Sequence, residues 1–234
     1  MRYVGNELAL FSGALHWKAY LRDVLGPHLG SDVLEVGAGM GSTTKVLTKA
    51  HAGRWTCLEP DATLASDIRR KVVAGELPES CRVVRGTLAA LAEPERFDSI
   101  LYIDVLEHIE DDAAEANLAT TFLRPGGKLI VLCPAHQWLY SPFDRAIGHF
   151  RRYSKRTLRS AIPASLELLE LAYLDSVGLL ASAGNRFLTR AADPSPAQVA
   201  IWDRLMVPMS RVLDPLVGNS FGKSVFGIWR KPVP

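Results

Sequence analysis

The sequence is poor in cysteine and has little excess of charge of either sign. Its only cysteines, Cys57, Cys81 and Cys133, lack the close spacing of a metal site. We therefore expect reduced thiols, as in a cytoplasmic protein, and no bound metal. The 27 lysines and arginines nearly balance 25 acidic residues, and the formal net charge of +2 gives no argument for a nucleic-acid partner.

Long apolar runs, repeats and low-complexity tracts are also missing. Although 48% of the residues are hydrophobic, no run is long enough to span a membrane. The first residues lack the basic and then apolar pattern of a signal peptide. We therefore expect a single domain over residues 1–234, with a helical lead-in (1–30), a ligand-binding core (31–134) and a final part of loops, helices and strands (135–234).

The most informative stretch joins an apolar segment to a glycine turn. Val33–Val36 has the composition of a parallel strand that is buried on both faces. Gly37, Gly39 and Gly41 follow at every second position, and glycine lets the backbone bend sharply and a ligand come close. Ser42–Thr44 offer caps for a helix. The free N–H groups and positive dipole end of such a helix suit a carboxylate or a phosphate.

The acid at Glu35 distinguishes between ligands of this turn. A dinucleotide-binding turn follows the pattern G-x-G-x-x-G, and Ser42 stands where its last glycine would fall. A carboxylate beside the turn would repel a pyrophosphate and attract an ammonium group. A ligand with an α-amino group, an α-carboxylate and a sulfonium therefore fits better. The stretch resembles motif I, E/D-x-G-x-G-x-G, of the class I S-adenosylmethionine (SAM) dependent methyltransferases.

Two further stretches resemble the next parts of that family. Arg54–Asp61 is predicted to be a second strand, and Glu59 lies roughly 20 residues beyond the glycine turn, where a strand-end acid meets a ribose. Arg82–Leu88 is predicted to be a third strand with its turn. Thr87 stands there at a position where the family often has an acid that holds the adenine amino group.

The fourth and fifth predicted strands complete the resemblance. Phe97–Ile109 resembles motif IV, and Asp104 would end its strand at the mouth of the ligand cleft. Leu123–Pro134 is predicted to be a Pro-Gly-Gly turn followed by a buried strand. A histidine after motif IV is structural as often as it is a contact, and an aromatic residue of the lead-in helix could cap the cleft. The resemblance implies SAM as cofactor, with contacts from Glu35, Gly37, Ala38, Gly39, Gly41, Thr43, Glu59, Pro60, Gly86, Thr87, Leu88, Asp104, Val105, His108 and Tyr20.

The order of the predicted elements indicates the fold class. Strands and helices alternate through the front half, as in an α/β core, and Leu166–Leu174 and Ser224–Arg230 are predicted to be two more strands. The resemblance implies a doubly wound, Rossmann-like mixed sheet of seven strands, six parallel and one antiparallel, with helices on both faces. Residues 196–217 have a helical apolar pattern, broken or kinked at Pro208 and Pro215. This segment could cover an apolar substrate, but we interpret the pattern as packing against the domain.

The acceptor is expected to bind under the segment from residue 135 to about 160, which is predicted to be an irregular, aromatic and basic loop. It resembles a bacterial subgroup of these methyltransferases with a P-x-H…D…G-H-x-R-R-Y stretch, whose members act on small molecules, some near sugar or lipid pathways. His136 and His149 are candidate general bases, because a neutral imidazole accepts a proton near pH 7. Tyr153 is a candidate for orienting the acceptor.

The resulting functional hypothesis is a SAM-dependent methyltransferase of EC 2.1.1 type that acts on an oxygen, nitrogen or carbon atom of a small molecule. The basic run at 151–159 allows an anionic acceptor, although a solvated helix face explains most such runs. Asp144 with Arg151 or Arg152 is interpreted as a salt bridge of the loop. Two alternatives are an NAD(P)-binding oxidoreductase and a non-catalytic SAM-binding domain. The oligomeric state, including a homodimer, is left open.

Overall fold

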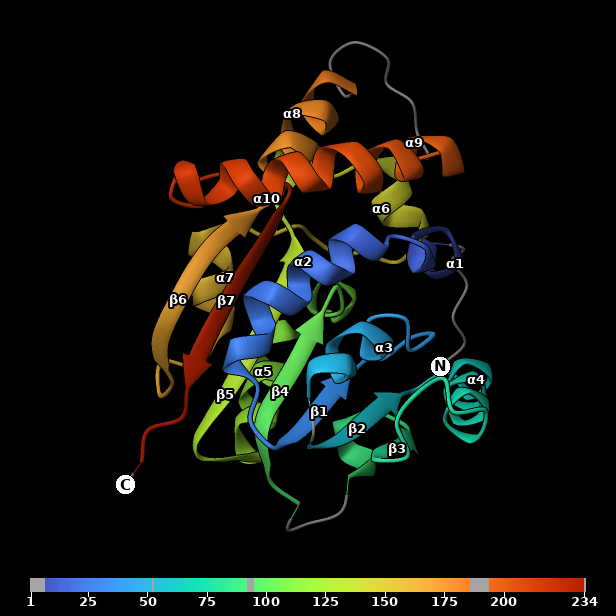
Figure 1. Cartoon of the computed structure of the whole chain (residues 1–234). Helices are drawn as coiled ribbons and strands as arrows, with labels where there is room; N and C mark the ends of the chain where they lie inside the picture. The colour runs from blue at the N-terminus through green and yellow to red at the C-terminus, as the bar shows by residue number, and fades with distance from the viewer. Residues whose placement is uncertain (1–6, 52, 92–94, 186–193, 234) are drawn as a thin grey trace.

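The strands of the computed structural model form one mixed sheet (Figure 1). The structure describes residues 7–51, 53–91, 95–185 and 194–233. The sheet contains seven strands in the order β3-β2-β1-β4-β5-β7-β6. Their bounds are Asp32–Val36 (β1), Arg54–Glu59 (β2), Cys81–Arg85 (β3), Phe97–Ile103 (β4), Leu123–Pro134 (β5), Glu167–Leu174 (β6) and Ser224–Arg230 (β7).

All strands except β7 run in the same direction. β1 pairs in parallel with β2 and β4, β2 with β3, and β4 with β5. β7 is antiparallel to both of its neighbours, β5 and β6. The expected sheet of six parallel strands and one antiparallel strand is confirmed.

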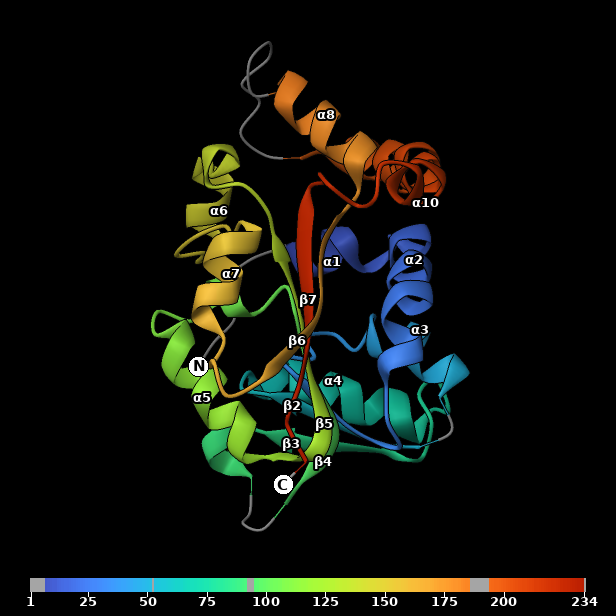
Figure 2. The same cartoon turned by 90° about the vertical axis from the view of Figure 1, so that its left-hand side faces the viewer.

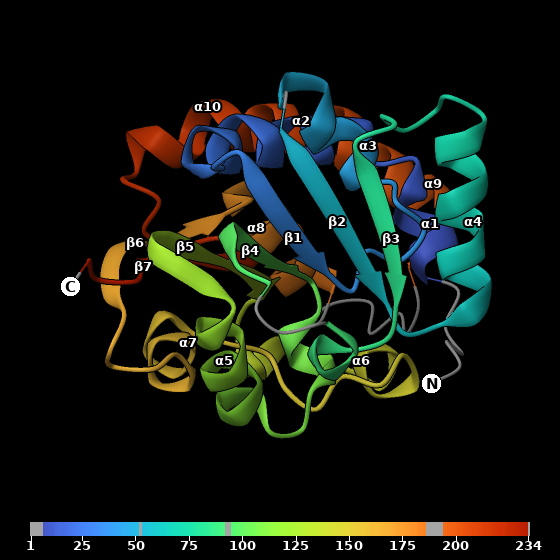
Figure 3. The same cartoon turned by 90° about the horizontal axis from the view of Figure 1, so that it is seen from below.

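Helices cover both faces of the sheet (Figures 2 and 3). One face carries α2, α3 and α4, and the other carries α5, α6 and α7. Among the described residues, no helix is long and apolar enough to cross a bilayer. The helices are Glu7–Ser12 (α1), Leu15–Leu25 (α2), Thr44–Leu47 (α3), Ala62–Val73 (α4), Asp112–Thr121 (α5), Pro142–Ala146 (α6), Lys155–Ala161 (α7), Ser176–Gly184 (α8), Pro196–Ile201 (α9) and Val207–Leu216 (α10).

The central strand β1 contributes to two apolar cores. Val33 and Leu34 are both fully buried, and they point to opposite faces because side chains alternate along a strand. Val33 packs in the core of α2, α3 and α4, with Leu21 and Ile68. Leu34 packs in the core of α5 and α7, with Leu158. Burial on both faces suits the three apolar residues among the five of β1.

The segment between β5 and β6 is more ordered than we expected from the sequence. It contains α6 and α7, each of which begins with a capping box. Ser141 and Asp144 exchange side-chain and backbone hydrogen bonds at the start of α6, and Ser154 and Thr157 do the same for α7. Such reciprocal bonds satisfy N–H groups that are otherwise unpaired, and they stabilise these short helices.

Two other local expectations are wrong. Thr43 occupies the N-cap of α3 but makes no side-chain cap bond, and the Thr44 hydroxyl donates to Glu35 instead. The Pro-Gly-Gly sequence lies inside β5 and not in a turn before it. Gly126 has φ 78° and donates to the Lys231 carbonyl, while the pairing of β4 with β5 shifts register opposite this point, as in a β-bulge.

The expected break at Pro208 takes the form of a change in helix type. A π-helical segment, Trp202–Met206, connects α9 to α10, and Pro208 lies in the first turn of α10. The missing N–H of a proline costs least in a first turn. Pro215 lies inside α10 near its last residue, and the helix ends at Leu216.

The expected packing of this helical run against the domain uses only some of its apolar residues, among them Val199 and Val207, which are buried. Leu205, Met209 and Leu216 are 61%, 54% and 77% exposed, whereas Asp203 and Asp214 are buried. The Asp214 carboxylate accepts bonds from the Tyr20 hydroxyl (2.9 Å) and from the N–H groups that open α8, those of Asp175 (2.7 Å) and Ser176 (3.0 Å). Polar contacts therefore fix which face of α10 turns inward.

Replacing Asp214 with Ala tests this polar anchor. Three buried donors would lose their acceptor, so we expect the free energy of unfolding to fall by about 3 kcal/mol. Urea unfolding followed by circular dichroism measures the change. Asp23→Ala, which removes an exposed partner of Arg22 and Arg211, is the control and should cost less than about 1 kcal/mol. Equal midpoints for Asp214→Ala and the unmodified protein would contradict the anchor.

Candidate functional site

The residues predicted to bind the cofactor meet at one end of the sheet. The glycine turn follows β1, Glu59 ends β2, Gly86 follows β3 and Asp104 follows β4. These strands are parallel neighbours, so their carboxyl ends lie along the same edge. In open α/β sheets this edge is where ligands bind.

The glycine turn has a backbone that side chains would obstruct. Gly37, Gly39 and Gly41 have φ values of 68°, 56° and 71°. A Cβ on Gly37 would lie 2.6 Å from a methyl carbon of Val105, in the loop after β4. A Cβ on Gly39 would lie 3.3 Å from Leu8 of α1. The turn is therefore packed from two sides, by the loop after β4 and by the lead-in helix.

Most N–H groups of the glycine turn itself are used within the chain. Gly37 and Ala38 both donate to the Leu58 carbonyl, at 2.8 and 3.2 Å, and Gly41 donates to Ala38. Gly39 donates to the Glu59 carboxylate at 2.8 Å. A pyrophosphate would need these donors and would face that carboxylate, so this arrangement disfavours a dinucleotide.

Glu59 holds the ends of β1 and β2 together. One carboxylate oxygen accepts the Gly39 N–H and the other accepts the Asp61 N–H at 2.9 Å. Burial raises the pKa of Glu59, and the two backbone donors oppose that shift. Each oxygen accepts one bond from these donors, and a carboxylate oxygen has two lone pairs. Glu59 can thus accept ligand hydroxyls while it clamps the turn.

Glu35 is tied to the protein interior. One of its oxygens accepts bonds from the Thr44 hydroxyl (2.6 Å) and the Trp55 indole N–H (2.8 Å). Burial raises the pKa of Glu35 to about 7, against the effect of these two donors, and the nearby Glu59 carboxylate raises it further. The carboxylate expected to attract an ammonium group therefore also joins β1 to α3 and β2.

The turn after β3 lies beside the end of β2. Gly86 donates to the Glu59 carbonyl at 3.0 Å, and its φ of 146° is one that residues with a Cβ rarely adopt. Thr87 precedes the 3₁₀ helix Leu88–Ala90, and Leu88 is fully buried in the core. Pro60, directly after β2, is half-buried.

Asp104 lies at the end of β4 among positive side chains. It adopts a left-handed backbone, with φ 53°, and remains exposed to solvent. Protein atoms crowd its carboxyl group and raise its pKa to about 6. The positive charges of Lys18 and Lys223, and of His149 when it is protonated, oppose this rise. These groups come from the segment before α7, from α2 and from the segment before β7. The site therefore brings together parts of the chain that are distant in sequence.

His149 is held by a buried carboxylate. Its Nδ1 lies 2.9 Å from Oδ1 of Asp144. The Arg152 guanidinium donates one bond to each oxygen of the same carboxylate, at 2.8 and 2.9 Å. These donors lower the pKa of Asp144 against the effect of burial, so Asp144 is ionised and Nδ1 carries a proton toward it. The Nε2 atom of His149 is then available to accept a proton. The expected salt bridge of Asp144 with Arg152 is present.

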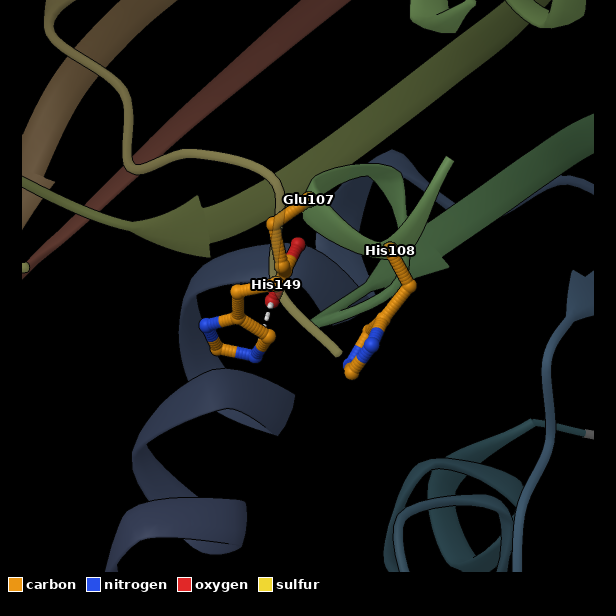
Figure 4. A group of neighbouring side chains, drawn as sticks. All are labelled: Glu107, His108 and His149. Carbon is orange, nitrogen blue, oxygen red and sulfur yellow. Dashed lines mark ion pairs between the residues drawn. The ribbon is translucent and has the colours of Figure 1, made fainter. Parts of the chain in front are cut away.

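Glu107 and His108 face His149 (Figure 4). The Nε2 atom of His149 lies 3.8 Å from a Glu107 oxygen, and the rings of His108 and His149 meet edge to face at 4.5 Å. Neither oxygen of the fully buried Glu107 has a well-formed hydrogen bond, although the Cys133 thiol lies close enough to favour its charged form. Burial raises the pKa of Glu107 and lowers that of His108 to about 4, which leaves His108 neutral at pH 7.

The same three side chains have the composition of a metal site. One ligand atom from each of Glu107, His108 and His149 lies within 4.8 Å of the others. A carboxylate and two neutral imidazoles are ligands that zinc and related ions accept, and Asp144 would fix the His149 tautomer as in many metal centres. The expectation that the protein binds no metal stays a prediction.

Other predicted site residues have protein partners. His136 (φ 67°) donates from Nε2 to the Gly222 carbonyl at 2.9 Å and stacks on Tyr173. The Tyr153 hydroxyl donates to Asp112 at 2.6 Å from within the core of α5 and α7. Tyr20 is 5% exposed and donates to Asp214. These positions favour an anchoring role for each.

Sequence reasoning missed several groups of the site. Lys18 is 5% exposed and donates to the Phe11 carbonyl, and Lys223 lies over the Trp202 ring at 4.9 Å. A lysine between the apolar residues of the lead-in helix was the available signal for Lys18. Nothing near Lys223 or Glu107 in the sequence indicated that they would approach the same loop.

Replacing Glu35 with Gln tests its buried charge. Between pH 4.5 and 7 the folded protein keeps a proton on Glu35 that the unfolded chain has released, so stability falls as the pH rises. Gln removes this dependence and still accepts from Thr44 and Trp55. We expect it to raise the free energy of unfolding by about 3 kcal/mol at pH 8 and by little at pH 4. Denaturant unfolding at both pH values measures this, with Glu167→Gln on exposed β6 as control, and equal effects at both pH values would refute it.

Comparisons with known proteins agree with this geometry. The family of methyltransferase domains named Methyltransf_11 matches residues 34–131, from β1 to β5. A ubiquinone/menaquinone biosynthesis C-methyltransferase of Paracoccus denitrificans is 31% identical over 148 residues, which are 58% of each chain. A demethylmenaquinone methyltransferase of Tropheryma whipplei is 28% identical over 70% of this chain and 67% of that protein. The chain thus spans a little over half the length of the first relative.

Solved structures share the fold. Geranyl diphosphate methyltransferase in complex with SAM has a TM-score of 0.64 at 13% identity, over 97% of this chain and 91% of that one. Coclaurine N-methyltransferase has a TM-score of 0.62 at 14% identity, over 91% of this chain and 71% of that one. These findings confirm the expected fold. Residues 34–131 match the Methyltransf_11 family of methyltransferase domains, and the whole described chain has the fold of solved SAM-dependent methyltransferases.

Proposed function

We propose that this protein transfers the methyl group of SAM to a small molecule with an ionisable acceptor group. The observation that carries the proposal is the Glu59 clamp on a glycine turn, in a domain whose family consists of methyltransferases. When bound, SAM supplies a methyl group that is activated by a positively charged sulfur. The chain must hold this group in line with the acceptor and exclude water.

The cofactor is proposed to lie along the carboxyl ends of β1 to β4. Glu59 would accept the ribose hydroxyls with its remaining lone pairs, and the close-packed turn from Gly37 to Gly41 would let the amino-acid part approach the backbone. The predicted contacts from Gly86 to Leu88 fit an adenine placed beside the end of β2. Asp104 and Val105 lie after β4, next to the turn, and Asp104 would face the ammonium group.

His149 is the proposed general base. With SAM bound, the acceptor would take the methyl group, and the electrons of the broken carbon–sulfur bond would stay on the sulfur. Nε2 of His149 would take the proton that the acceptor loses. Asp144 holds Nδ1–H, so that the imidazole accepts at Nε2 and the resulting positive charge is stabilised. His136 is the weaker candidate, because its Nε2 is engaged with Gly222.

The charges around Asp104 favour an acceptor that carries or develops negative charge. Lys18, Lys223 and Arg152 all lie near this carboxyl group, and Arg152 alone has a bidentate acidic partner. A phenolic or enolic hydroxyl, or the ring carbon beside it, fits this field. Two relatives are named as a ubiquinone/menaquinone biosynthesis C-methyltransferase and a demethylmenaquinone methyltransferase, and such names refer to compounds of this general kind. A sugar- or lipid-linked acceptor fits the same charge requirement.

Replacing Glu59 with Ala tests the cofactor site. Saturating SAM should raise the melting temperature of the unmodified protein, because a ligand that binds only the folded state stabilises it. We expect Glu59→Ala to lose most of this rise and to weaken SAM binding in calorimetry at least tenfold, whatever its own melting temperature. Glu167→Ala, on exposed β6, is the matched control and should keep the full rise. A full rise in Glu59→Ala would exclude this site.

Replacing His149 with Gln tests the base. The protein is incubated with methyl-labelled SAM and fractionated small-molecule extracts, and labelled products are identified by mass spectrometry. With the acceptor found, His149→Gln should lower kcat by about 10²-fold or more at pH 7 with unchanged SAM affinity. His28→Gln, which changes a histidine outside the site, should leave kcat unchanged. SAM binding without any labelled product would identify a non-catalytic domain, and an active His149→Gln would exclude the base.

A further inference from the structure

The helical run from α9 to α10 turns several polar side chains inward and several apolar side chains outward. Asp203, Ser210 and Asp214 are 4%, 0% and 0% exposed, and Val207 is buried with them, whereas Leu205, Met209, Val212 and Leu213 face solvent. An ordinary surface helix has the opposite arrangement, with its apolar stripe against the core. We define the outer helical face by its exposed apolar side chains, which are Leu180 of α8 and Leu205, Met209, Val212, Leu213 and Leu216 of the run.

The inward polar contacts prevent the run from rotating about its own axis. Asp203 accepts the N–H groups of His16 (3.3 Å) and Trp17 (2.9 Å) at the start of α2. Asp214 accepts two N–H groups at the start of α8, as described above. A rotation that buried the leucines would leave these donors and both carboxylates without partners, at a cost larger than the apolar area could return. The exposure of the outer helical face is therefore built into the fold.

The outer helical face spans two helices, α8 and α10, which pack on each other. Both lie beyond the end of β6 and the start of β7, and α10 also contacts α2 (Figures 1 and 2). Leu205 and Leu216 lie on opposite sides of the middle of this face, with Met209 and Val212 between them. Single exposed leucines are ordinary, but a stripe of this length over two helices marks a binding surface.

The charges around this face are mainly positive. Within residues 194–222, both acidic side chains are buried, and the exposed charged side chains are Arg204 and Arg211. Arg211 pairs with Asp23, which Arg22 also contacts, so this edge carries two arginines for one aspartate. A helix with an apolar face and arginines beside it is typical of segments that lie in the interface of an anionic bilayer.

We propose that the outer helical face binds the surface of a membrane that contains anionic lipids. The leucines, Met209 and Val212 would enter the boundary between head groups and acyl chains, and Arg204 would contact lipid phosphates. A second copy of the chain fits less well, because a twofold contact would bring together two surfaces of the same charge. If the proposed methyl transfer holds, an acceptor with an apolar or lipid-linked part is the kind of molecule that this surface would bring to the protein.

Vesicle co-sedimentation tests this surface with the full chain. We expect the protein to sediment with vesicles of phosphatidylglycerol and phosphatidylcholine and to bind vesicles of phosphatidylcholine alone at least tenfold more weakly. The triple variant Leu205→Ser, Met209→Ser, Leu216→Ser should lose at least tenfold in binding to the anionic vesicles. Val73→Ser, which changes a 90% exposed apolar residue of α4, is the matched control and should bind as the unmodified protein does.

The substituted side chains are exposed, so the triple variant is expected to keep its melting temperature and its affinity for SAM. Those two measurements separate this inference from the proposed function. Absence of binding to both kinds of vesicle, or full binding by the triple variant, would overturn the proposal. A dimer of the unmodified protein in analytical ultracentrifugation that the triple variant lacks, together with no vesicle binding, would assign the face to a second copy.

Discussion

The hydrogen bond from the Gly39 N–H to the Glu59 carboxylate is the contact on which the site depends. It joins the turn after β1 to the end of β2, and the other Glu59 oxygen binds the start of α4 through Asp61. The Glu59 carboxylate therefore occupies the position in which a dinucleotide-binding turn would hold a pyrophosphate. The turn keeps its sharp backbone but is suited to a ligand with hydroxyl and ammonium donors.

Buried carboxylates organise the rest of the molecule in a similar way. Asp144 orients His149 and holds Arg152, and Asp203 and Asp214 bind the first N–H groups of α2 and α8. Each of these acids has several donors, which offset the cost of removing its charge from water. One consequence is an enclosed histidine with a fixed tautomer. Another is a helical run with several apolar residues that face outward.

Local signals in the sequence were sufficient to predict the strands, whereas the antiparallel placement of the last strand was implied by the family resemblance. An apolar stretch such as Val33–Val36 and a turn of alternating glycines are determined by neighbouring residues, and all seven strands lie close to their predicted ranges. The roles of side chains in the back half were harder to predict. Periodicity indicates that 196–217 is helical, but it does not show which face turns inward. That face is set by the hydrogen bonds that Asp203 accepts from the start of α2, nearly 190 residues away, and that Asp214 accepts from the start of α8, about 40 residues away. The approach of Lys18, Lys223 and Glu107 to one loop depends equally on the tertiary fold.

The central claim is that the glycine turn accepts an amino-acid-bearing sulfonium and not a diphosphate. Titration calorimetry of the unmodified protein with SAM and, separately, with NADH tests it most directly. The account predicts a saturable heat with SAM at one site per chain and no heat of binding with NADH. Binding of NADH, or the absence of any binding of SAM, would contradict it.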